Sequence, residues 1–406
     1  MSEAYFKAIK SLKRIAKQHA RGIELFINLT HECPLRCSYC YVDYEKKTDW
    51  SQEKLEYLVD TLIAKQHLIK LVTFFGGEPG LKYDVIKSTL EYAERKGMGN
   101  TQFAIITSLS SHANKLLSLI DDFPNLEIVV SMDSEKDSKR VTAKGQSFIP
   151  IVRESNNPDK ITYDRISKYR KNVIINKIVL GEEELRRNFQ WLHDTYDKYG
   201  IMFSYNFVKD AEKVNYSNIV EGIYHHLLWC KDSDFVPQKT KSLLHSWVKH
   251  QGHMIEPGCG INSEYFLDGT GITTPCSIFH SLKDDENKRL LMVTDETGKI
   301  SEQMEMITEL EKNYFDNPTC LKCDLKGFCN GGCLALRYQK NGDFNIPNTA
   351  HCDIMLAVYR GIELFKHVVP KKVFDRFLVD QCGDLVKMMG YCTDKNIYNN
   401  NISESM

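Results

Sequence analysis

The chain has 406 residues, of which 42% are hydrophobic and 26% charged, and its formal net charge is −1. This length suits two or three domains with a sizeable core, and the near-zero charge gives no bulk attraction to nucleic acid or to an anionic membrane. No apolar run is long enough to span a bilayer, and residues 1–7 lack the apolar segment of a signal peptide. We therefore expect a cytoplasmic protein whose partners are neither nucleic acid nor membrane.

Cysteine usage is the most informative feature of the composition. In a reducing compartment, clustered cysteines are more typical of metal ligands than of disulfides. Ten of the thirteen cysteines form two groups. The first group is Cys33, Cys37 and Cys40, and the second is Cys259, Cys276, Cys320, Cys323, Cys329, Cys333 and Cys352.

Strand and helix patterns alternate along the first half of the chain. Residues 1–21 predict an amphipathic helix that packs on the following domain. The predicted strands are Ile23–Leu29, Leu71–Phe75, Phe103–Thr107, Leu126–Ser131, Val173–Val179 and Met202–Val208, and the predicted helices are 51–66, 82–97, 112–121, 160–170 and 183–198. Apolar strands alternating with helices of this length indicate βαβ units and a parallel sheet. The fold class is α/β, and six such units suit a partial (β/α)6 barrel over residues 22–210.

The first cysteine group follows the first predicted strand directly. Three thiolates within eight residues, from Cys33 to Cys40, can converge on one soft metal centre. In a four-iron cluster, three protein ligands leave one iron open for another ligand. A structural zinc site or a disulfide pair are the alternatives for this motif taken alone.

The spacing Cys-x3-Cys-x2-Cys, with Tyr39 before the last cysteine, resembles the radical S-adenosylmethionine (SAM) superfamily. The resemblance implies a [4Fe–4S] cluster whose open iron is chelated by SAM. It also implies cleavage of SAM to methionine and a 5′-deoxyadenosyl radical. Active sites of parallel α/β folds gather at the carboxyl ends of strands, which is where this loop begins.

A second motif, Gly76-Gly77-Glu78-Pro79, ends the second predicted strand. Paired glycines allow close approach of the backbone to a ligand, and Glu78 adds an acceptor. In the family that this chain resembles, the signature contacts the amino group of SAM. A motif gains meaning from its context, and here it ends the strand that follows the cysteine loop.

The third and fourth strands end in segments that depart from the family pattern. The third strand ends in Thr107-Ser108-Leu109, where many relatives have Thr-Asn-Gly. After the fourth strand, Ser134 replaces the glycine of the family's Ser-x-Asp-Gly segment. The resemblance assigns the carboxylate end of SAM to Ser131 and Arg153, with Arg140 as the second candidate arginine. A guanidinium suits this role because it binds a carboxylate through two hydrogen bonds.

The second cysteine group lies in residues 257–353, after a helical connector at 211–256. Residues 265–276 predict two short strands around a glycine turn, ending in Cys276. The order of cysteines resembles the SPASM extension, which holds two auxiliary [4Fe–4S] clusters; a zinc ribbon is the alternative for its Cys-x2-Cys alone. The resemblance assigns one auxiliary cluster to Cys320, Cys323, Cys329 and Cys352, and the other to Cys259, Cys276 and Cys333.

The second of these clusters lacks one ligand relative to fully ligated relatives. Neighbours of Cys259 offer no further cysteine, so an open iron is the first expectation, with His253 or Cys230 as substitutes. Residues 354–406 predict a helix, beginning near Met355, and a polar tail that is disordered.

The resemblance implies an anaerobic, oxidoreductase-type maturase of a ribosomally made peptide. It would abstract a hydrogen and form a thioether or carbon–carbon crosslink, or oxidise a side chain. Expected partners are the precursor peptide, a flavodoxin- or ferredoxin-type electron donor and a separate leader-binding protein. A sulfatase-maturating enzyme and a small-molecule oxidase or epimerase are the alternative enzymes, and an iron–sulfur electron carrier is the non-enzymatic one. Ser277 stands where the sulfatase-maturating relatives have an aspartate base, which counts against that alternative.

Overall fold

The structure is a computed structural model that describes most of the chain. The described residues are 3–18, 22–40, 42–44, 48, 50–64, 68–98, 101–135, 138–157, 159–179, 184–207, 213–252, 264–277, 318–329, 331–343 and 345–388. The chain divides into two compact units. The first comprises residues 1–177, 199–202 and 260–310, and the second comprises 178–198, 203–259 and 311–406.

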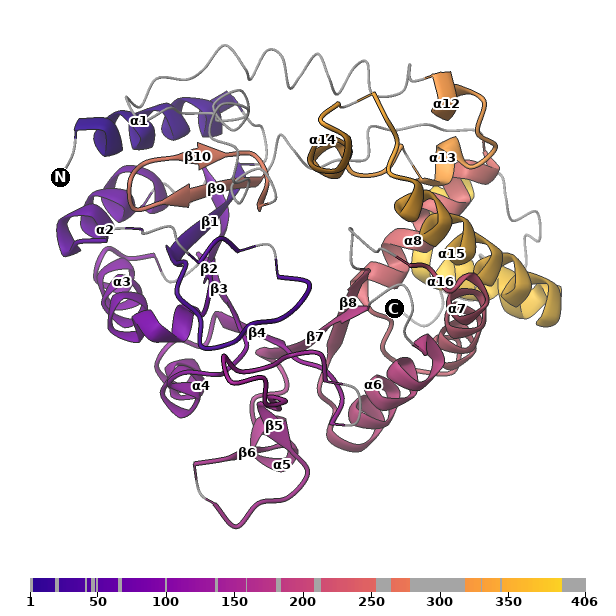
Figure 1. Ribbon diagram of the computed structural model, residues 1–406, viewed down its shortest axis with the longest axis horizontal. Helices are drawn as coiled ribbons and strands as arrows, with labels where there is room; N and C mark the ends of the chain where they lie inside the picture. Colours follow the sequence, from indigo (N-terminus) through magenta and orange to yellow (C-terminus); the bar gives the residue numbers. More distant parts are fainter. Residues whose placement is uncertain are drawn as a thin grey trace, which may run out of the picture. The chain divides into compact units, whose positions relative to one another are not determined.

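A parallel sheet forms the centre of the first unit (Figure 1). Its parallel strands in chain order are β1 (Ile23–Thr30), β2 (Ile69–Gly76), β3 (Gln102–Thr107), β4 (Leu126–Ser131), β7 (Val173–Val179) and β9 (Glu264–Asp268). The strand order is β9-β1-β2-β3-β4-β7, and neighbouring strands in this series pair in parallel. The predicted α/β class with a parallel sheet is therefore confirmed.

Burial patterns along these strands explain why they form where the sequence predicts them. In β7, Val173, Ile175, Lys177 and Val179 are buried, while the alternate residues Ile174, Asn176 and Ile178 are partly exposed. The last four residues of β1 are all buried, so this strand is covered on both faces. The carboxyl end of β1 consequently emerges from the core straight into the cysteine loop.

Helices of the first unit lie along one side of β1–β4, as Figure 1 shows for α1 to α4. They are α1 (Glu3–Gln18), α2 (Gln52–Leu58), the π-helix η1 (Val59–Ile63), the 3-10 helix η2 (Pro79–Lys82), α3 (Tyr83–Arg95), α4 (Ala113–Asp122) and α5 (Tyr163–Ser167). Ser51 caps α2 by accepting from the Lys54 amide. The single helix predicted over 51–66 is instead an α-helix that widens into a π-helix. A short parallel pair, β5 (Ile151–Val152) and β6 (Ile161–Thr162), follows β4 in the chain.

The predicted hairpin near Cys276 adds to the same sheet, which the sequence did not indicate. Strand β9 pairs with β1, and β10 (Thr273–Thr274) returns antiparallel to β9. The Phe26 and Phe266 rings stack between the strands with centroids 4.5 Å apart. The Asp268 carboxylate closes the turn by accepting from the backbone amides of residues 270–272 at 2.9–3.1 Å.

Helices dominate the second unit. Its elements are α6 (Leu185–Tyr199, whose last residue belongs to the first unit), β8 (Phe203–Phe207), α7 (Tyr216–Cys230), α8 (Gln238–Gln251), α12 (Pro318–Leu321), α13 (Lys326–Cys329), α14 (Leu334–Asn341), α15 (Thr349–Val368) and α16 (Lys371–Met388). Helix α15 packs along α7, and α16 packs on α8. Helix α15 begins six residues before the predicted start at Met355, because Asn348 caps it by accepting from the His351 amide. Helix α16 was not predicted, and the polar tail after it lies outside the described residues.

Buried histidines hold part of this unit together. The His193 and His226 rings share a hydrogen bond of 2.8 Å, and His226 also bonds to Thr240 at 2.8 Å. The Trp229 ring stacks on His193, and the Phe189 ring stacks on His226, each with centroids 4.2 Å apart. Burial lowers the pKa of His193 to about 3 and that of His226 well below its usual value. Both rings are therefore neutral core residues.

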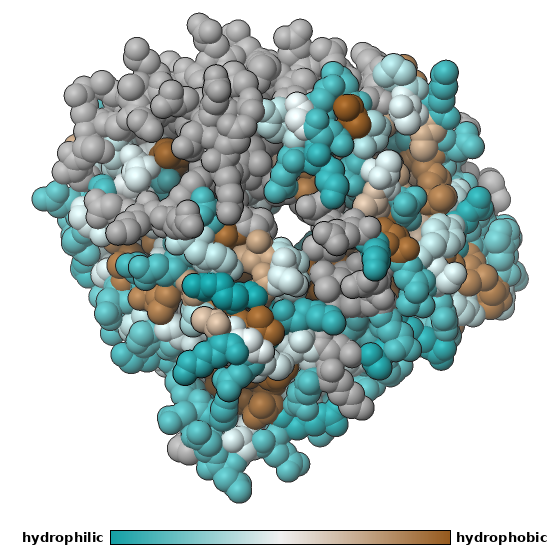
Figure 2. Space-filling model, viewed as in Figure 1, coloured by the Kyte–Doolittle hydropathy of each residue, from teal (hydrophilic) through white to brown (hydrophobic). Residues whose placement is uncertain are grey.

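The exposed face drawn in Figure 2 is mostly hydrophilic, with apolar side chains in small patches. Over α15 and α16, the large apolar side chains at the surface are Leu364, Val368 and Val373. Among the described residues, no helix combines the length and the apolar character that crossing a bilayer requires.

Candidate functional site

The three cysteines of the first group lie on the loop that leaves the carboxyl end of β1. Cys33 and Cys37 are half-buried, whereas Cys40 is exposed. The loop is internally hydrogen-bonded: the Cys40 amide donates to the Cys37 carbonyl at 3.1 Å, and the Leu35 amide donates to Cys33 Sγ at 3.4 Å. The Arg36 guanidinium donates to the Cys33 carbonyl at 2.6 Å. The loop thus carries its three thiols on a defined backbone at the edge where ligands of parallel sheets bind.

A second segment supports this loop from the side. The Arg36 amide donates to the Val141 carbonyl at 2.7 Å, and the Ala143 amide donates to the Pro34 carbonyl at 3.3 Å. Leu35 and Thr142 form an antiparallel bridge between these bonds. The cysteine loop is consequently paired like a short strand with residues 141–143, which follow β4 in the chain.

The thiols of this loop influence one another electrostatically. The pKa of Cys33 is raised to about 11, mainly by burial and also by nearby Glu78, Cys40 and Cys37, while the hydrogen bond from Leu35 opposes the rise. Burial also raises the pKa of Cys37, and the charge of Arg140 lowers it. Only thiolates bind metals, so loading this site would release protons. Three soft thiols on one loop fit an iron–sulfur cluster. In the described part of the chain, no three Cys, His, Asp or Glu side chains converge as they would around a single ion.

The glycines of Gly76-Gly77-Glu78-Pro79 pack against the start of the cysteine loop. A Cβ on Gly76 would lie 2.2 Å from the Thr30 carbonyl oxygen, and one on Gly77 would lie 2.2 Å from that of Glu32. The Gly77 amide donates to the Thr30 carbonyl at 2.6 Å, and the Glu78 amide donates to the Glu32 carbonyl at 2.8 Å. Because Gly76 and Gly77 have no side chains, the loop after β2 can form backbone hydrogen bonds with the start of the cysteine loop. The same lack of side chains would let a ligand approach their backbone.

Glu78 is buried and bonded entirely within the protein. Its Oε1 accepts from the Gly80 amide at 2.9 Å and from Thr107 Oγ1 at 2.5 Å. Its Oε2 accepts from the Ser108 amide at 3.0 Å, from the Ser108 hydroxyl and from Ser110 Oγ at 3.1 Å. The carboxylate ties the loop after β2 to the end of β3, while Gly76 and Gly77 remain half-exposed and Pro79 is buried. The accessible part of this motif is the glycine backbone. Ser108, whose segment departs from the family pattern, donates to Glu78 through both its amide and its hydroxyl.

The residues assigned to the carboxylate end of SAM fall into different places. Ser131 ends β4 and is half-buried. Arg153 is exposed, and its amide donates to Glu135 Oε1 at 3.2 Å. Arg140 is buried, and its guanidinium carbon lies 5.6 Å from the centroid of the Tyr39 ring. Of the two arginines, Arg140 is the one that lies against the cysteine loop.

A buried ion pair between Lys177 and Asp133 lies next to Arg140. Lys177 Nζ lies 2.9 Å from Asp133 Oδ1, and Arg140 Nε lies 3.9 Å from Asp133 Oδ2. Both Asp133 and Lys177 are fully buried. Lys177 was not predicted as a functional residue, although a signal was present: it occupies the buried face of β7 that Val173, Ile175 and Val179 otherwise line.

The second cysteine group divides between the two units. Cys320, Cys323, Cys329 and Cys352 all belong to the second unit, and the charges of their thiols affect one another. Cys276 follows β10 in the first unit and Cys333 belongs to the second. Cys259 and His253 lie outside the described residues. The four-cysteine set is thus present in one unit, and the Cys259, Cys276 and Cys333 set stays a prediction. Cys230, proposed as a substitute ligand, is buried with its Sγ 3.5 Å from His226 Nε2.

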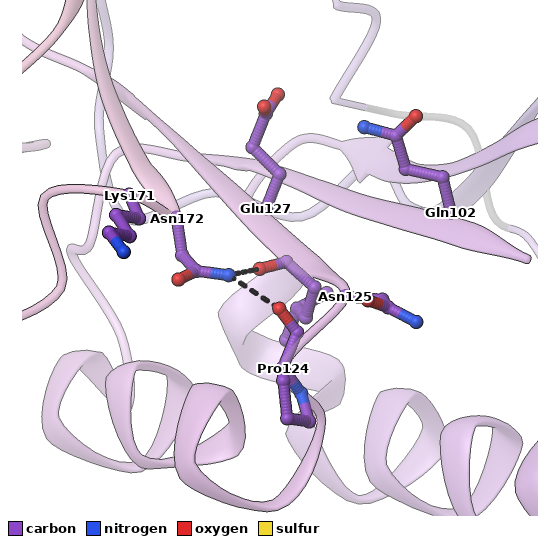
Figure 3. Close-up of a pocket in the computed structure, with 7 residues that line it drawn as sticks. Gln102, Pro124, Asn125, Glu127, Lys171 and Asn172 are labelled. Atoms are coloured by element: carbon purple, nitrogen blue, oxygen red, sulfur yellow. Dashed lines mark hydrogen bonds between the residues drawn. The ribbon is translucent and has the colours of Figure 1, made fainter. Parts of the chain in front are cut away.

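A polar depression of about 400 Å³ lies at the amino ends of the strands, opposite to the ends that carry the cysteine loop (Figure 3). Asn172 donates from its amide to the carbonyls of Pro124 at 2.8 Å and Leu126 at 2.9 Å, and burial raises the pKa of Glu127 beside them. These residues stand at the amino ends of β4 and β7. Ligands of parallel α/β folds bind at the carboxyl ends, so the cysteine edge is the candidate site.

Comparisons with known proteins agree with this placement. Residues 27–192 match the radical SAM superfamily. The radical SAM cyclopropyl synthase TigE of Paramaledivibacter caminithermalis is 20% identical over 388 residues, covering 86% of this chain and 76% of that protein. A probable GTP 3',8-cyclase of Saccharolobus islandicus is 33% identical over 64 residues, which is 16% of this chain and 21% of that protein.

Two solved structures share the fold at low sequence identity. The structure of anSMEcpe with bound AdoMet and the Cp18Cys peptide has a TM-score of 0.61 and 15% identity, covering 85% of this chain and 100% of that one. Streptococcus suis SuiB bound to the precursor peptide SuiA has a TM-score of 0.57 and 15% identity, covering 84% and 79%. At this identity the likeness concerns the fold. The matched segment begins inside β1 and carries the cysteine loop, so residues 27–192 are a radical SAM domain.

Proposed function

We propose that this protein is a radical SAM peptide maturase that installs a crosslink in a ribosomally made peptide. The observation that carries the proposal is the cysteine loop at the carboxyl end of β1, backed by the Gly76–Gly77 turn and by residues 141–143. A loop bonded on two sides keeps its ligands in position, which a reactive cofactor requires.

In this proposal, Cys33, Cys37 and Cys40 would hold a [4Fe–4S] cluster, with SAM at its open iron. When bound, the cluster and SAM together would supply a carbon-centred radical for hydrogen abstraction. The half-exposed backbone of Gly76 and Gly77 would accept from the SAM amino group, and Tyr39 would border the site.

At the carboxylate end of SAM, buried charges would hold an arginine in place. Ser131 would bind the SAM carboxylate with either Arg153 or Arg140. Arg140 has the better support, because it is buried beside Tyr39 and anchored near Asp133. A fixed guanidinium binds a carboxylate with little loss of side-chain entropy. The positive charge of Arg140 also favours the thiolate form of Cys37.

The auxiliary clusters belong to the same proposal. Residues 257–353 would form a SPASM domain, with one cluster on Cys320, Cys323, Cys329 and Cys352 and another on Cys259, Cys276 and Cys333. Four thiols in one unit, each affecting its neighbours, fit the first of these. Electrons would come from a flavodoxin- or ferredoxin-type donor, and a separate protein would present the leader of the peptide.

The peptide substrate is supported by the fold likeness to two structures that contain bound peptides. A cyclopropyl ring requires a carbon–carbon bond, so the similarity to a cyclopropyl synthase favours a carbon–carbon crosslink over a thioether. The same fold likeness is compatible with the sulfatase-maturating alternative. However, Ser277 follows Cys276 at the position where that alternative expects an aspartate base. A serine hydroxyl is a poor base at neutral pH.

The proposal is tested by anaerobic co-expression with the short peptide encoded beside the gene, followed by mass spectrometry. A crosslink removes two hydrogens per event and leaves no aldehyde for a hydrazine probe to trap. Loss of two hydrogens with hydrazine capture would instead identify oxidation of serine to formylglycine. The Cys33, Cys37 and Cys40 triple alanine variant is the control and is expected to leave the peptide unchanged. A peptide of unaltered mass with the parent enzyme, while SAM is still cleaved, would contradict the proposal.

A further inference from the structure

Arg337 in α14 is among the largest fully buried side chains of the described residues, with 2% of its surface exposed. Its Nη2 donates to Cys320 Sγ at 3.1 Å and to the Gly331 carbonyl. The guanidinium therefore joins a cysteine of α12 to the glycine turn between Cys329 and Cys333. A buried cation that donates to a sulfur is an unusual use of arginine, which more often pairs with a carboxylate or phosphate.

Short helices bring the other three cysteines of the set to the same unit. The Cys323 amide donates to the Cys320 carbonyl at 3.1 Å, and the Cys329 amide donates to the Leu325 carbonyl at 2.8 Å. Helix α13, which ends at Cys329, packs against α15, which carries Cys352. The four thiols thus come from three helices and their connections, and Arg337 contacts this assembly from inside.

The charge of Arg337 reaches several of these thiols. The pKa of Cys329 is raised to about 12, mainly by burial and also by Cys352, Cys320 and Cys323, while Arg337 opposes the rise. Burial and the neighbouring thiols likewise raise the pKa of Cys352, and Arg337 again opposes them. The guanidinium is consequently a fixed positive charge that acts on Cys329 and Cys352 as well as on Cys320, to which it donates.

We propose that Arg337 is a positioning residue that raises the reduction potential of the cluster bound by Cys320, Cys323, Cys329 and Cys352. This inference rests on the proposed function, since it requires an auxiliary cluster on these cysteines. Reduction adds one electron to the cluster, so a buried cation stabilises the reduced form more than the oxidised form. Hydrogen bonds to the ligating sulfurs act in the same direction.

The test uses the full chain, reconstituted anaerobically with iron and sulfide, in the Cys33, Cys37 and Cys40 triple alanine background. Only auxiliary clusters remain there, and their reduction is followed by electron paramagnetic resonance in a mediated redox titration. R337M removes the charge and the hydrogen bond. We expect at least a tenfold fall in the reduced-to-oxidised ratio of one cluster at fixed potential, which is about 59 mV for a one-electron couple.

Two further variants make the titration decisive. R337K keeps a positive charge but not the planar fork, and we expect a smaller fall in the same ratio together with retained iron. R360M makes the same charge change at an exposed arginine of α15 and is expected to leave the titration unchanged. Loss of about four irons from R337M but not from R337K, with helical circular dichroism retained, would also support the positioning role.

The inference is overturned if R337M holds its iron and both clusters titrate as in the parent. It is also overturned if R360M shifts the titration as far as R337M does. Failure of the auxiliary-cluster part of the proposed function has a different result: the triple alanine background would then bind no iron–sulfur cluster at all, whatever residue stands at position 337.

Discussion

Thr107, the last residue of β3, donates a hydrogen bond of 2.5 Å to Glu78 in the loop after β2, and both side chains are buried. Each carboxylate oxygen of Glu78 also accepts from a backbone amide, that of Gly80 or that of Ser108. The carboxylate therefore holds together the ends of two neighbouring strands at the edge of the sheet where SAM is proposed to bind.

Glu78→Ala is expected to destabilise the protein by on the order of 3 kcal/mol, because several buried donors lose their acceptor. Glu78→Gln should recover only part of the loss, since its amide NH2 must face one of the two backbone N–H groups. Thermal unfolding monitored by circular dichroism under anaerobic conditions measures both. Glu91→Ala, a half-exposed residue of α3, is the control and should change little. Equal stability of Glu78→Ala and Glu91→Ala would refute this role.

Gly77→Ala is expected to cost the protein its loop-bound iron. The added Cβ would lie 2.2 Å from the Glu32 carbonyl oxygen, so the ladder between the glycine turn and the cysteine loop must open. Gly97→Ala is the comparison, because Gly97 has a φ of +76° with open space around it. It should lose about 1 kcal/mol of stability from the left-handed backbone and keep all its iron. Iron analysis after reconstitution decides, and full iron in Gly77→Ala would argue against the shared ladder.

The buried pair of Lys177 and Asp133 gives a third prediction. Lys177→Met leaves the Asp133 carboxylate buried without its nearest cation, which typically costs about 3–5 kcal/mol. Asp133→Asn with Lys177→Met removes both charges and should recover much of that loss. A double-mutant cycle on unfolding midpoints measures the coupling. If the two substitutions simply add, the 2.9 Å contact does not contribute as an ion pair.

Stability should fall in mild acid because of the buried histidines. Burial lowers the pKa of His193 to about 3, whereas an unfolded histidine has a pKa of about 6.5. Between these values the unfolded chain binds more protons than the folded one, so stability decreases as the pH falls from about 6.5 toward 3 and is fully present above 6.5. The slope is at most about 1.4 kcal/mol per pH unit for each such histidine.

His193→Phe is expected to reduce the steepness of that pH dependence, because the phenyl ring does not titrate and retains the stacking surface on Trp229. His367→Gln, at a side chain that is 73% exposed, is the control and should leave the slope as it is. Unfolding midpoints at several pH values between 4 and 8 provide the measurement. A slope unaffected by His193→Phe would show that other groups cause the acid sensitivity.

Much of the first unit followed from local pattern. The bounds of β4 and β7 agree with the predicted Leu126–Ser131 and Val173–Val179, because each is a short run rich in β-branched apolar residues that directly follows an asparagine. The placement of the cysteine loop at a strand end follows from the same patterns. Local pattern does not specify which strand a hairpin joins, so the pairing of β9 with β1 was not predicted.

Site residues were predictable where a motif names them and not where only packing does. The spacing of the cysteines is what predicts them as ligands, but the partners of Glu78 depend on how two loops meet. As a ligand of the SAM carboxylate, Arg140 was predicted only as the second candidate after Arg153. Its position along the sequence does not show that it is buried beside Tyr39. Arg337 carries no motif at all, and its contact with Cys320 arises only when α14 folds back on α12.

The central claim is that Cys33, Cys37 and Cys40 hold the cluster that activates SAM, and that further clusters lie elsewhere in the chain. The most direct measurement is iron content together with 5′-deoxyadenosine formation, for the parent and the triple alanine variant, after anaerobic reconstitution. We predict about twelve irons per chain and SAM cleavage for the parent, and about eight irons with no cleavage for the variant. A variant that still forms 5′-deoxyadenosine would contradict the account.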